Sequence, residues 1–127
     1  MAENKEYYTQ KVENGSIQIS EDVVASVAAM AVMEQEGVCG LSTGIGSDIA
    51  EMLGMKSAAK GVRIVSDKEG RLFVECNVVA NFGYSVFELA KNVQENVKSS
   101  VESVTGLRVA EVNVTVCGIA LPRESRK

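Results

Sequence analysis

The sequence contains no histidine and no tryptophan, and only a single proline. Without histidine it has no side chain that commonly exchanges protons near neutral pH, no imidazole to bind a metal, and no Ser-His or Cys-His pair. Carboxylate-based catalysis needs two acids that converge in a cleft, and no pair of acids stands out from those of helix ends and turns. We therefore expect a protein that is not an enzyme, with no catalytic residues, no metal site and no cofactor.

Long apolar runs are also missing, because no stretch approaches the roughly 18–20 residues that a helix needs to cross a bilayer. The first residues show neither a basic start followed by an apolar stretch nor a cleavage site, so we expect no signal peptide. The cysteines Cys39, Cys76 and Cys117 are odd in number and have apolar neighbours, which favours buried thiols over disulfides. These features predict a cytoplasmic protein that does not insert directly into a membrane.

Basic residues are fewer than acidic ones, 13 against 17, and they are unevenly placed. The resulting net charge of −4 disfavours nucleic acid as a partner. The segment from Val12 to Met55 contains acids but no lysine or arginine. Two interpretations stay open for this segment: ordinary solvent-exposed helix faces, or an acidic surface that binds a basic segment of a partner.

The features that are present are typical of one small globular domain. The 127 residues suit a single hydrophobic core, and 46% of them are apolar although only 5% are aromatic. The core is therefore expected to consist mainly of aliphatic side chains. We expect a disordered N-terminal arm over residues 1–14, a single domain over residues 15–120 and a flexible tail over residues 121–127.

A first long helix is predicted over about residues 21–35. It follows a short alternating strand at residues 16–20, begins after the N-cap Ser20, and stops at Gly37. Apolar residues recur along it at intervals of three and four and are expected to face the core. They are Val23, Val24, Val27, Ala28, Met30 and Ala31.

A second long helix begins with a capping box formed by Ser85 and Glu88, in which each side chain pairs with the backbone N–H of the other. Gly106 ends it. Its apolar stripe has the same spacing and is also expected to face the core. The stripe consists of Val86, Leu89, Ala90, Val93, Val97, Val101 and Val104.

Three further strands are predicted, two before the second helix in the sequence and one after it. Residues 62–65 and 72–80 flank a turn at residues 67–70, which predicts a hairpin. Alternate residues of its second strand should face the core, namely Leu72, Val74, Cys76 and Val78. The last strand, residues 107–117, changes phase at Ala110-Glu111, which predicts a β-bulge, with the valines after that bulge in the core.

Together these elements predict the α+β class with two layers. We expect a small mixed or antiparallel β-sheet, made of the strands near residues 16, 62, 72 and 107, and two long helices packed on one face of it.

The segment from residue 37 to residue 61 is rich in glycine and less regular. Residues 38–41 suit a brief strand, and Ser47 suits the cap of a short helix. Gly44 and Gly46 precede that helix and could direct backbone N–H groups at a phosphate, as in a nucleotide-binding enzyme. Because a Walker lysine and a third glycine are missing, a flexible connector is the favoured interpretation.

Three apolar residues fall out of phase with the predicted core, namely Val65, Phe73 and Val79. They would lie on the opposite face of the sheet. An apolar face of this kind is usually shielded from water by other protein residues. Two explanations are equally supported. Either another subunit or partner protein covers this face, or residues 37–61 of the same chain do.

Several short motifs, taken in their order and spacing over about residues 15–120, resemble the alkaline-shock, or envelope-stress, protein family of Gram-positive bacteria. The motifs are Gly15-Ser-Ile-Gln-Ile-Ser20 with Val23-Val24, Glu36-Gly37-Val38, Lys60-Gly61-Val62, Asn81-Phe-Gly83 with Val86, Val93-Gln94-Glu95-Asn96-Val97, Thr105-Gly106-Leu107, and Val112-Asn113-Val114-Thr-Val116-Cys-Gly118-Ile119.

This resemblance implies a non-enzymatic cytoplasmic protein that forms homo-oligomers or binds other proteins, including a membrane-anchored partner that would hold it at the membrane. It implies a role in cell-envelope homeostasis or the stress response. Some relatives are linked to metabolism, so a regulatory partner of a lipid-synthesis or central-metabolism enzyme is the alternative. Because a long charged N-terminal extension is missing, an abundant stress protein and a shorter housekeeping paralogue both stay open. The motif positions carried over, with expected structural roles, are Gly83, Gln94, Gly106, Asn113 and Gly118.

Overall fold

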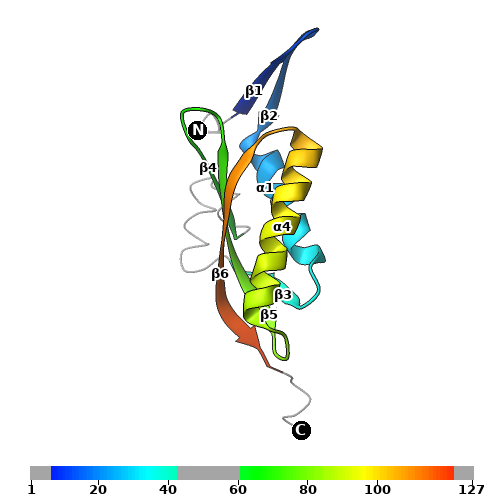
Figure 1. The fold of residues 1–127 in the computed structure, drawn as a ribbon, viewed down its shortest axis with the longest axis vertical. Coiled ribbons are helices and arrows are strands. Elements are labelled where there is room, and N and C mark those ends of the chain that lie inside the picture. Colours follow the sequence, from blue (N-terminus) through cyan, green and yellow to red (C-terminus); the bar gives the residue numbers. More distant parts are fainter. Residues whose placement is uncertain (1–6, 43–60, 122–127) are drawn as a thin grey trace.

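The computed structural model describes residues 7–42 and 61–121. Figure 1 shows the long helices packed together on one face of a β-sheet, with a separate hairpin projecting from one end. The predicted α+β fold is therefore confirmed. The elements are β1 (Tyr7–Val12), β2 (Gly15–Ser20), α1 (Glu21–Glu34), β3 (Val38–Leu41), β4 (Val62–Ser66), β5 (Leu72–Asn81), α4 (Val86–Thr105) and β6 (Val109–Ala120).

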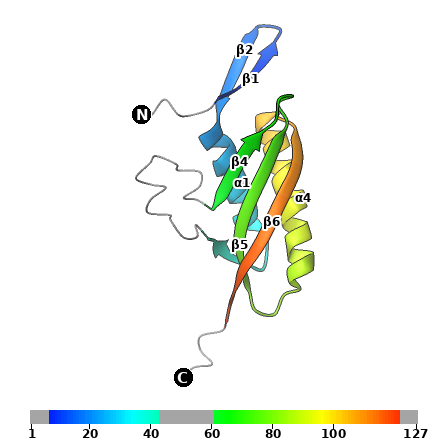
Figure 2. The same ribbon diagram turned by 90° about the vertical axis from the view of Figure 1, so that its left-hand side faces the viewer.

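The sheet is mixed and has β5 at its centre. β6 pairs with β5 in parallel, whereas β3 and β4 pair with it antiparallel. The N–H of Asn77 donates to the carbonyl of Gly61 at 3.1 Å, and the carbonyl of Asn77 accepts from the N–H of Ser42 at 2.9 Å. Because the N–H and C=O of one strand residue point to the same edge, β3 and β4 share one edge of β5. β6 lies along the other edge, as Figure 2 shows.

Both helices begin at the residues that the sequence predicts. The Ser20 hydroxyl accepts a hydrogen bond from the N–H of Val23 at 3.2 Å, and the Ser85 hydroxyl accepts one from the N–H of Glu88 at 3.3 Å. These bonds pair backbone donors that have no partner inside the first helical turn. At the other end of α4, Gly106 adopts the left-handed conformation with φ of 76°.

The buried stripe of α4 differs from the predicted one at both ends. It repeats every fourth residue, whereas Val86 and Val104 are exposed. A step of four residues turns the stripe by about 40° around the helix axis. The stripe therefore rotates away from both of these valines. The buried residues are Leu89, Val93, Val97, Val101 and Thr105.

The hydrophobic core lies between the helices and the sheet. Along β5 the alternation is as predicted, with Leu72, Val74, Cys76 and Val78 buried. Burial raises the pKa of the Cys76 thiol to about 12, so this thiol stays protonated at physiological pH. The predicted turn after β4 is also confirmed, since the carboxylate of Asp67 accepts the N–H groups of Glu69 and Arg71, both at 2.9 Å.

The last strand contains the predicted bulge. Leu72 pairs with Val109 but Phe73 pairs with Glu111, so Ala110 is the extra residue. The bulge changes the phase of the strand, and apolar residues before it as well as after it therefore face the core. They are Leu107 and Val109 before the bulge, and Val112, Val114 and Val116 after it.

The N-terminal region differs from its prediction. Residues 7–12, expected within a disordered arm, form β1, and β2 pairs with β1 instead of joining the main sheet. Tyr8 is buried against the core and Ile19 packs there, while the Gln10 amide Nε2 donates to the carbonyl of Thr105 at 3.1 Å. The remainder of the arm, the short helix capped by Ser47, the Gly44–Gly46 loop and residues 122–127 of the tail lie outside the described residues.

Glu102 links the end of α4 to the start of β6. Its oxygen Oε2 accepts a hydrogen bond from the backbone N–H of Val109 at 2.9 Å and lies 3.1 Å from Nζ of Lys98. The hydrogen bond from Val109, followed by that from Lys98, lowers the pKa of Glu102 below its ordinary value of 4.5.

A lowered folded-state pKa means that the charge of Glu102 stabilises the fold fully above about pH 4.5, and that this contribution is lost as the pH falls through the lowered value. Substitution Glu102→Gln keeps an acceptor for Val109 but removes the charge. We expect the difference in free energy of unfolding between wild type and E102Q to shrink as urea unfolding is repeated from neutral to acidic pH. A difference that stays constant with pH would contradict this assignment.

Candidate functional site

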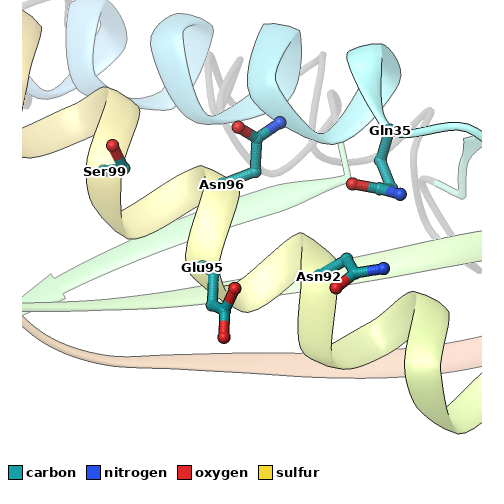
Figure 3. A pocket seen from close by; sticks show the side chains of 5 residues that line it. All are labelled: Gln35, Asn92, Glu95, Asn96 and Ser99. Atoms are coloured by element: carbon teal, nitrogen blue, oxygen red, sulfur yellow. The ribbon is translucent and has the colours of Figure 1, made fainter.

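The described residues offer little for small-molecule chemistry. Residues 7–42 and 61–121 contain no group of three or more His, Cys, Asp or Glu side chains that could hold a metal ion. A shallow hollow of about 280 Å³ lies beside α4 near the end of α1 (Figure 3). Glu95 is the single ionisable group among its lining residues, which are Gln35, Asn92, Glu95, Asn96 and Ser99.

The hollow also has a structural explanation. Nδ2 of Asn96 donates to the carbonyl of Ala31 at 2.8 Å and so fastens α4 to α1. A lone carboxylate without a second acid or a base beside it does not form an acid–base pair. The exposed apolar surfaces are therefore the better candidates for a functional site.

The predicted interface residues lie on the same face of the sheet, the one that points away from the helices, which we call the open sheet face. Figure 2 looks onto this face, with the helices behind the sheet. Val65 and Phe73 are direct cross-strand partners, and Val79 lies farther along β5 on the same side. Val65 is 39% exposed, whereas Phe73 and Val79 are half-buried. An ion pair between Arg63 and Glu75, at 3.7 Å, lies beside them.

Two glycines flatten the open sheet face around Val79. Gly40 and Gly118 are the cross-strand partners of Val79, one on each side. Since glycine has no Cβ, the side chain of Val79 has no side chain next to it on either neighbouring strand. A flat surface of this kind allows the backbone of another chain to approach closely.

Cys39 and Cys117 are exposed, so the prediction that they are buried is wrong. The pairing register shifts beside each of them. The extra residue of a β-bulge is left out of the alternation between inside and outside, which is why their apolar neighbours gave a misleading signal. Sγ of Cys117 lies 3.4 Å from the carbonyl of Val78.

The motif positions carried over from the family resemblance do not gather into one site. Gly83 and Gly106 occupy turns with φ of 107° and 76°, and Gly118 lies opposite Val79. Nε2 of Gln94 donates to the carbonyl of Val112 at 2.9 Å, which ties α4 to β6. Asn113 is exposed on the open sheet face, where its side chain contacts Glu111 at 3.5 Å. Gly83 and Gly106 thus lie in turns and Gln94 links α4 to β6, while structural roles for the whole set stay a prediction.

Sequence reasoning missed an apolar surface on α1. Val23, Met30 and Met33 are between 46% and 64% exposed and form what we call the α1 outer face. The spacing of apolar residues predicted Val23 and Met30 in the core stripe, and that prediction is wrong. Helix α1 is apolar on opposite sides, so periodicity alone does not tell which side is buried. The side that packs in the core consists of Val24, Ala25, Ala28, Ala31 and Val32.

A third apolar surface, also missed, lies at one end of the molecule, where the connection from β5 to α4 meets the end of β6 (Figure 1). The N–H of Phe82 donates to the carbonyl of Ala120 at 2.9 Å and joins the two segments. The signal in the sequence was the clustering of three aromatic residues within residues 82–87 of a chain that has six in total. We call this surface the aromatic pole; its residues are Phe82, Tyr84, Phe87, Ile119 and Leu121, which are 44% to 71% exposed.

None of the helices in the described ranges combines the length and the apolar composition that a membrane crossing requires.

The sequence is similar to several bacterial proteins over most of its length. It is 34% identical to the uncharacterized protein Spy1614 of Streptococcus pyogenes, covering 88% of this chain and 93% of that protein. It is 31% identical to the uncharacterized protein YloU of Bacillus subtilis, covering 83% and 88%, and 26% identical to YqhY of the same species, covering 89% and 83%. A solved MamM-CTD structure has a TM-score of 0.47 and 14% identity, covering 77% of this chain and 98% of that one.

Residues 9–121 match the family model of alkaline shock protein 23, which is described as having a cell envelope-related function. The match covers nearly the whole domain and confirms the resemblance drawn from the motifs. The chain therefore belongs to the alkaline shock protein 23 family.

Proposed function

We propose that the protein is a non-enzymatic binding protein that associates with copies of itself and with an envelope partner through the open sheet face. The observation that carries the proposal is that Val65 and Phe73, which are cross-strand partners, and Val79 farther along β5 lie on a sheet face that none of the described helices covers. The cell envelope-related description of the family supports the setting. In this proposal the protein works in the cytoplasm and reaches the membrane through its partner.

Burial of apolar side chains would stabilise this association. Moving a fully exposed Val or Phe side chain from water into an apolar interface stabilises association by roughly 1.5–3 kcal/mol. Val65, Phe73 and Val79 would each contribute less, because part of each side chain is already buried. Antiparallel and mixed sheets tolerate one solvated face when that face is polar, but here apolar residues interrupt it. Because Gly40 and Gly118 carry no side chains, a partner can approach the backbone of the sheet closely on both sides of Val79.

The double substitution Val65→Glu with Val79→Glu tests this proposal. Two carboxylates on the open sheet face would have to be desolvated in the interface. We expect the dissociation constant of self-association, measured by sedimentation velocity, to rise at least about tenfold, which corresponds to about 1.4 kcal/mol. The control Lys68→Glu, in the exposed turn after β4, changes the net charge by the same amount and should leave association unchanged.

Two results would contradict the proposal. One is a wild-type protein that stays monomeric at every concentration and yields no crosslinked envelope partner in cells. The other is a double variant that associates and crosslinks as the wild type does. In either case residues 37–61 of the same chain would be the better candidates to cover this face.

A further inference from the structure

We infer that the chain pairs with a second copy of itself along the outer edge of β6. The β6 strands of the two copies would run antiparallel and join the two sheets into one continuous sheet. This inference goes beyond the proposed function, because it uses the backbone at one edge of the sheet and not the side chains of the open sheet face. The residues concerned are 113–117, which we call the β6 edge.

The backbone of β6 directs hydrogen-bonding groups away from the rest of the sheet. Asn77 directs its N–H and C=O toward β3 and β4, so its neighbours Cys76 and Val78 direct theirs toward β6. In a parallel pair, only one of two opposite residues directs both groups at the other strand. The partners of these two neighbours, Val114 and Val116, therefore direct their N–H and C=O groups outward.

Side chains of α4 close the outer edge of β6 before residue 113. Nζ of Lys98 donates to the carbonyl of Val109 at 3.0 Å, and Nε2 of Gln94 donates to the carbonyl of Val112 at 2.9 Å. Among the described residues, no such side chain reaches the outward groups of the β6 edge. This part of the strand therefore presents donors and acceptors that another strand can pair with.

The β6 edge has neither charge nor proline to prevent strand pairing. Exposed edge strands commonly carry charged side chains, especially lysine, or proline, and these residues hinder the approach of another strand. Residues 113–117 read Asn-Val-Thr-Val-Cys and contain neither. The register shift beside Cys117 ends the regular stretch on one side, and Gln94 ends it on the other. A short uncharged stretch with β-branched residues at its centre is left to pair.

A second copy fits this edge because an antiparallel pair about a two-fold axis is self-complementary. With the axis at Thr115, Val114 lies opposite Val116 of the second copy, and each outward N–H and C=O of these valines gains a partner. Thr115 lies opposite itself, and such Thr–Thr pairs stabilise a sheet. Asn113 lies opposite Cys117, so no charged side chain of the edge meets another. The pairing therefore needs no residue from outside this chain.

Helix α4 leaves room for the added strand. In Figure 2 the sheet ends at β6, whereas the beginning of α4 extends past that strand on the side away from β5. Phe87, Lys91 and Gln94 follow one another at spacings of four and three residues, so they share the side of α4 from which Gln94 reaches β6. Phe87 is 71% exposed there. A strand added to β6 would lie against this side of α4 and extend the two-layer arrangement.

A charge placed on the two-fold axis tests the inference. The full-length V65E/V79E protein is the background, because it lacks the association proposed for the open sheet face, and we expect it to form a dimer in sedimentation velocity. Thr115→Lys puts two lysines directly opposite each other and should raise the dissociation constant of this dimer at least about threefold. Equimolar mixing with Thr115→Glu should restore dimers. The control Asn113→Lys, at an equally exposed position, places its charge opposite Cys117 and should have a smaller effect.

Disulfide formation tests the register of the pair. Opposite residues that do not exchange hydrogen bonds have Cα atoms about 4.5 Å apart, a distance that a disulfide spans. The exposed thiols Cys39 and Cys117 would first be replaced by serine in the same background. Thr115→Cys should then give a crosslinked dimer on mild oxidation. Asn113→Cys should not, because the two copies of position 113 would lie about 14 Å apart along the strands.

Any of three results would overturn the inference. They are a V65E/V79E protein that stays monomeric at every concentration, a dimer that Thr115→Lys leaves unchanged, and equal crosslinking at positions 113 and 115. None of them contradicts the proposed function, which is tested by the loss of association between the wild type and V65E/V79E. Failure of the inference and failure of the proposed function are therefore distinguishable.

Discussion

Replacing Gly37 by alanine is expected to lower the free energy of unfolding by about 2–5 kcal/mol. Gly37 is buried after the end of α1 and has φ of +97°, a conformation that side chains rarely adopt. A methyl group there would lie 2.7 Å from Cδ1 of Leu89 and 2.9 Å from Cδ2 of Tyr84. The carbonyl of Gly37 also accepts the N–H of Asn81 at 2.8 Å, so the backbone is not free to relieve the contact.

The matched control is Gly83→Ala. Gly83 has a similar φ of +107°, but an added methyl group would meet no atom within 4 Å. The control therefore carries the conformational cost alone, about 1–2 kcal/mol. Urea unfolding of the two variants measures the difference between them, which is the steric contribution. Equal losses in both variants would show that the space around Gly37 is not restricted.

Truncating Leu72 to alanine is expected to cost about 2–5 kcal/mol of unfolding free energy. Leu72 begins β5, is 0% exposed, and is among the largest fully buried side chains. Its N–H donates to the carbonyl of Arg108 at 2.9 Å, which holds the start of β5 against the chain that enters β6. Because the backbone is held, the surrounding core has little freedom to collapse into the space that the side chain leaves.

Leu121→Ala provides the comparison, since this leucine is 66% exposed. Removing it should change the unfolding free energy by less than about 0.5 kcal/mol. The urea midpoint should shift for Leu72→Ala while the slope of the transition stays the same. A loss below about 1 kcal/mol at Leu72 would be incompatible with a packed core at the start of β5.

Much of the fold was predictable because local signals agreed with the tertiary structure. The hydroxyl groups of Ser20 and Ser85 cap the helices as their sequence contexts predict, and the alternation in β5 predicts its buried side. The bulge at Ala110 was visible as a change of phase between apolar residues. In each case the information lies within a few residues of the chain.

The structure differs from the prediction in two situations. In one, a strand depends on contacts with residues far away in the sequence; in the other, two sides of a helix are equally apolar. Strand β1 is a strand because β2 pairs with it and because Gln10 reaches Thr105, contacts that its mixed composition does not reveal. Helix α1 is apolar on two sides, and only the position of the sheet determines that Val24 is inside and Met30 is outside.

The candidate site was partly predictable for the same reason. The phase of the strands placed Val65, Phe73 and Val79 on one face, and the structure confirms this placement. The flatness around Val79 depends on two register shifts, which no local pattern indicated. The aromatic pole requires residues 82–87 and the end of β6 to meet, and their meeting depends on the parallel pairing of β5 with β6.

The projecting β1–β2 hairpin bears on how the protein is degraded. A two-stranded ribbon has little stability in water by itself, and this one is held to the body through the side chains of Tyr8, Gln10 and Ile19. Opening of the ribbon leaves the pairing of β5 with its neighbours intact, so it costs less than global unfolding. Within residues 7–42 and 61–121, a protease would therefore gain access at this ribbon before it reaches the strands of the main sheet.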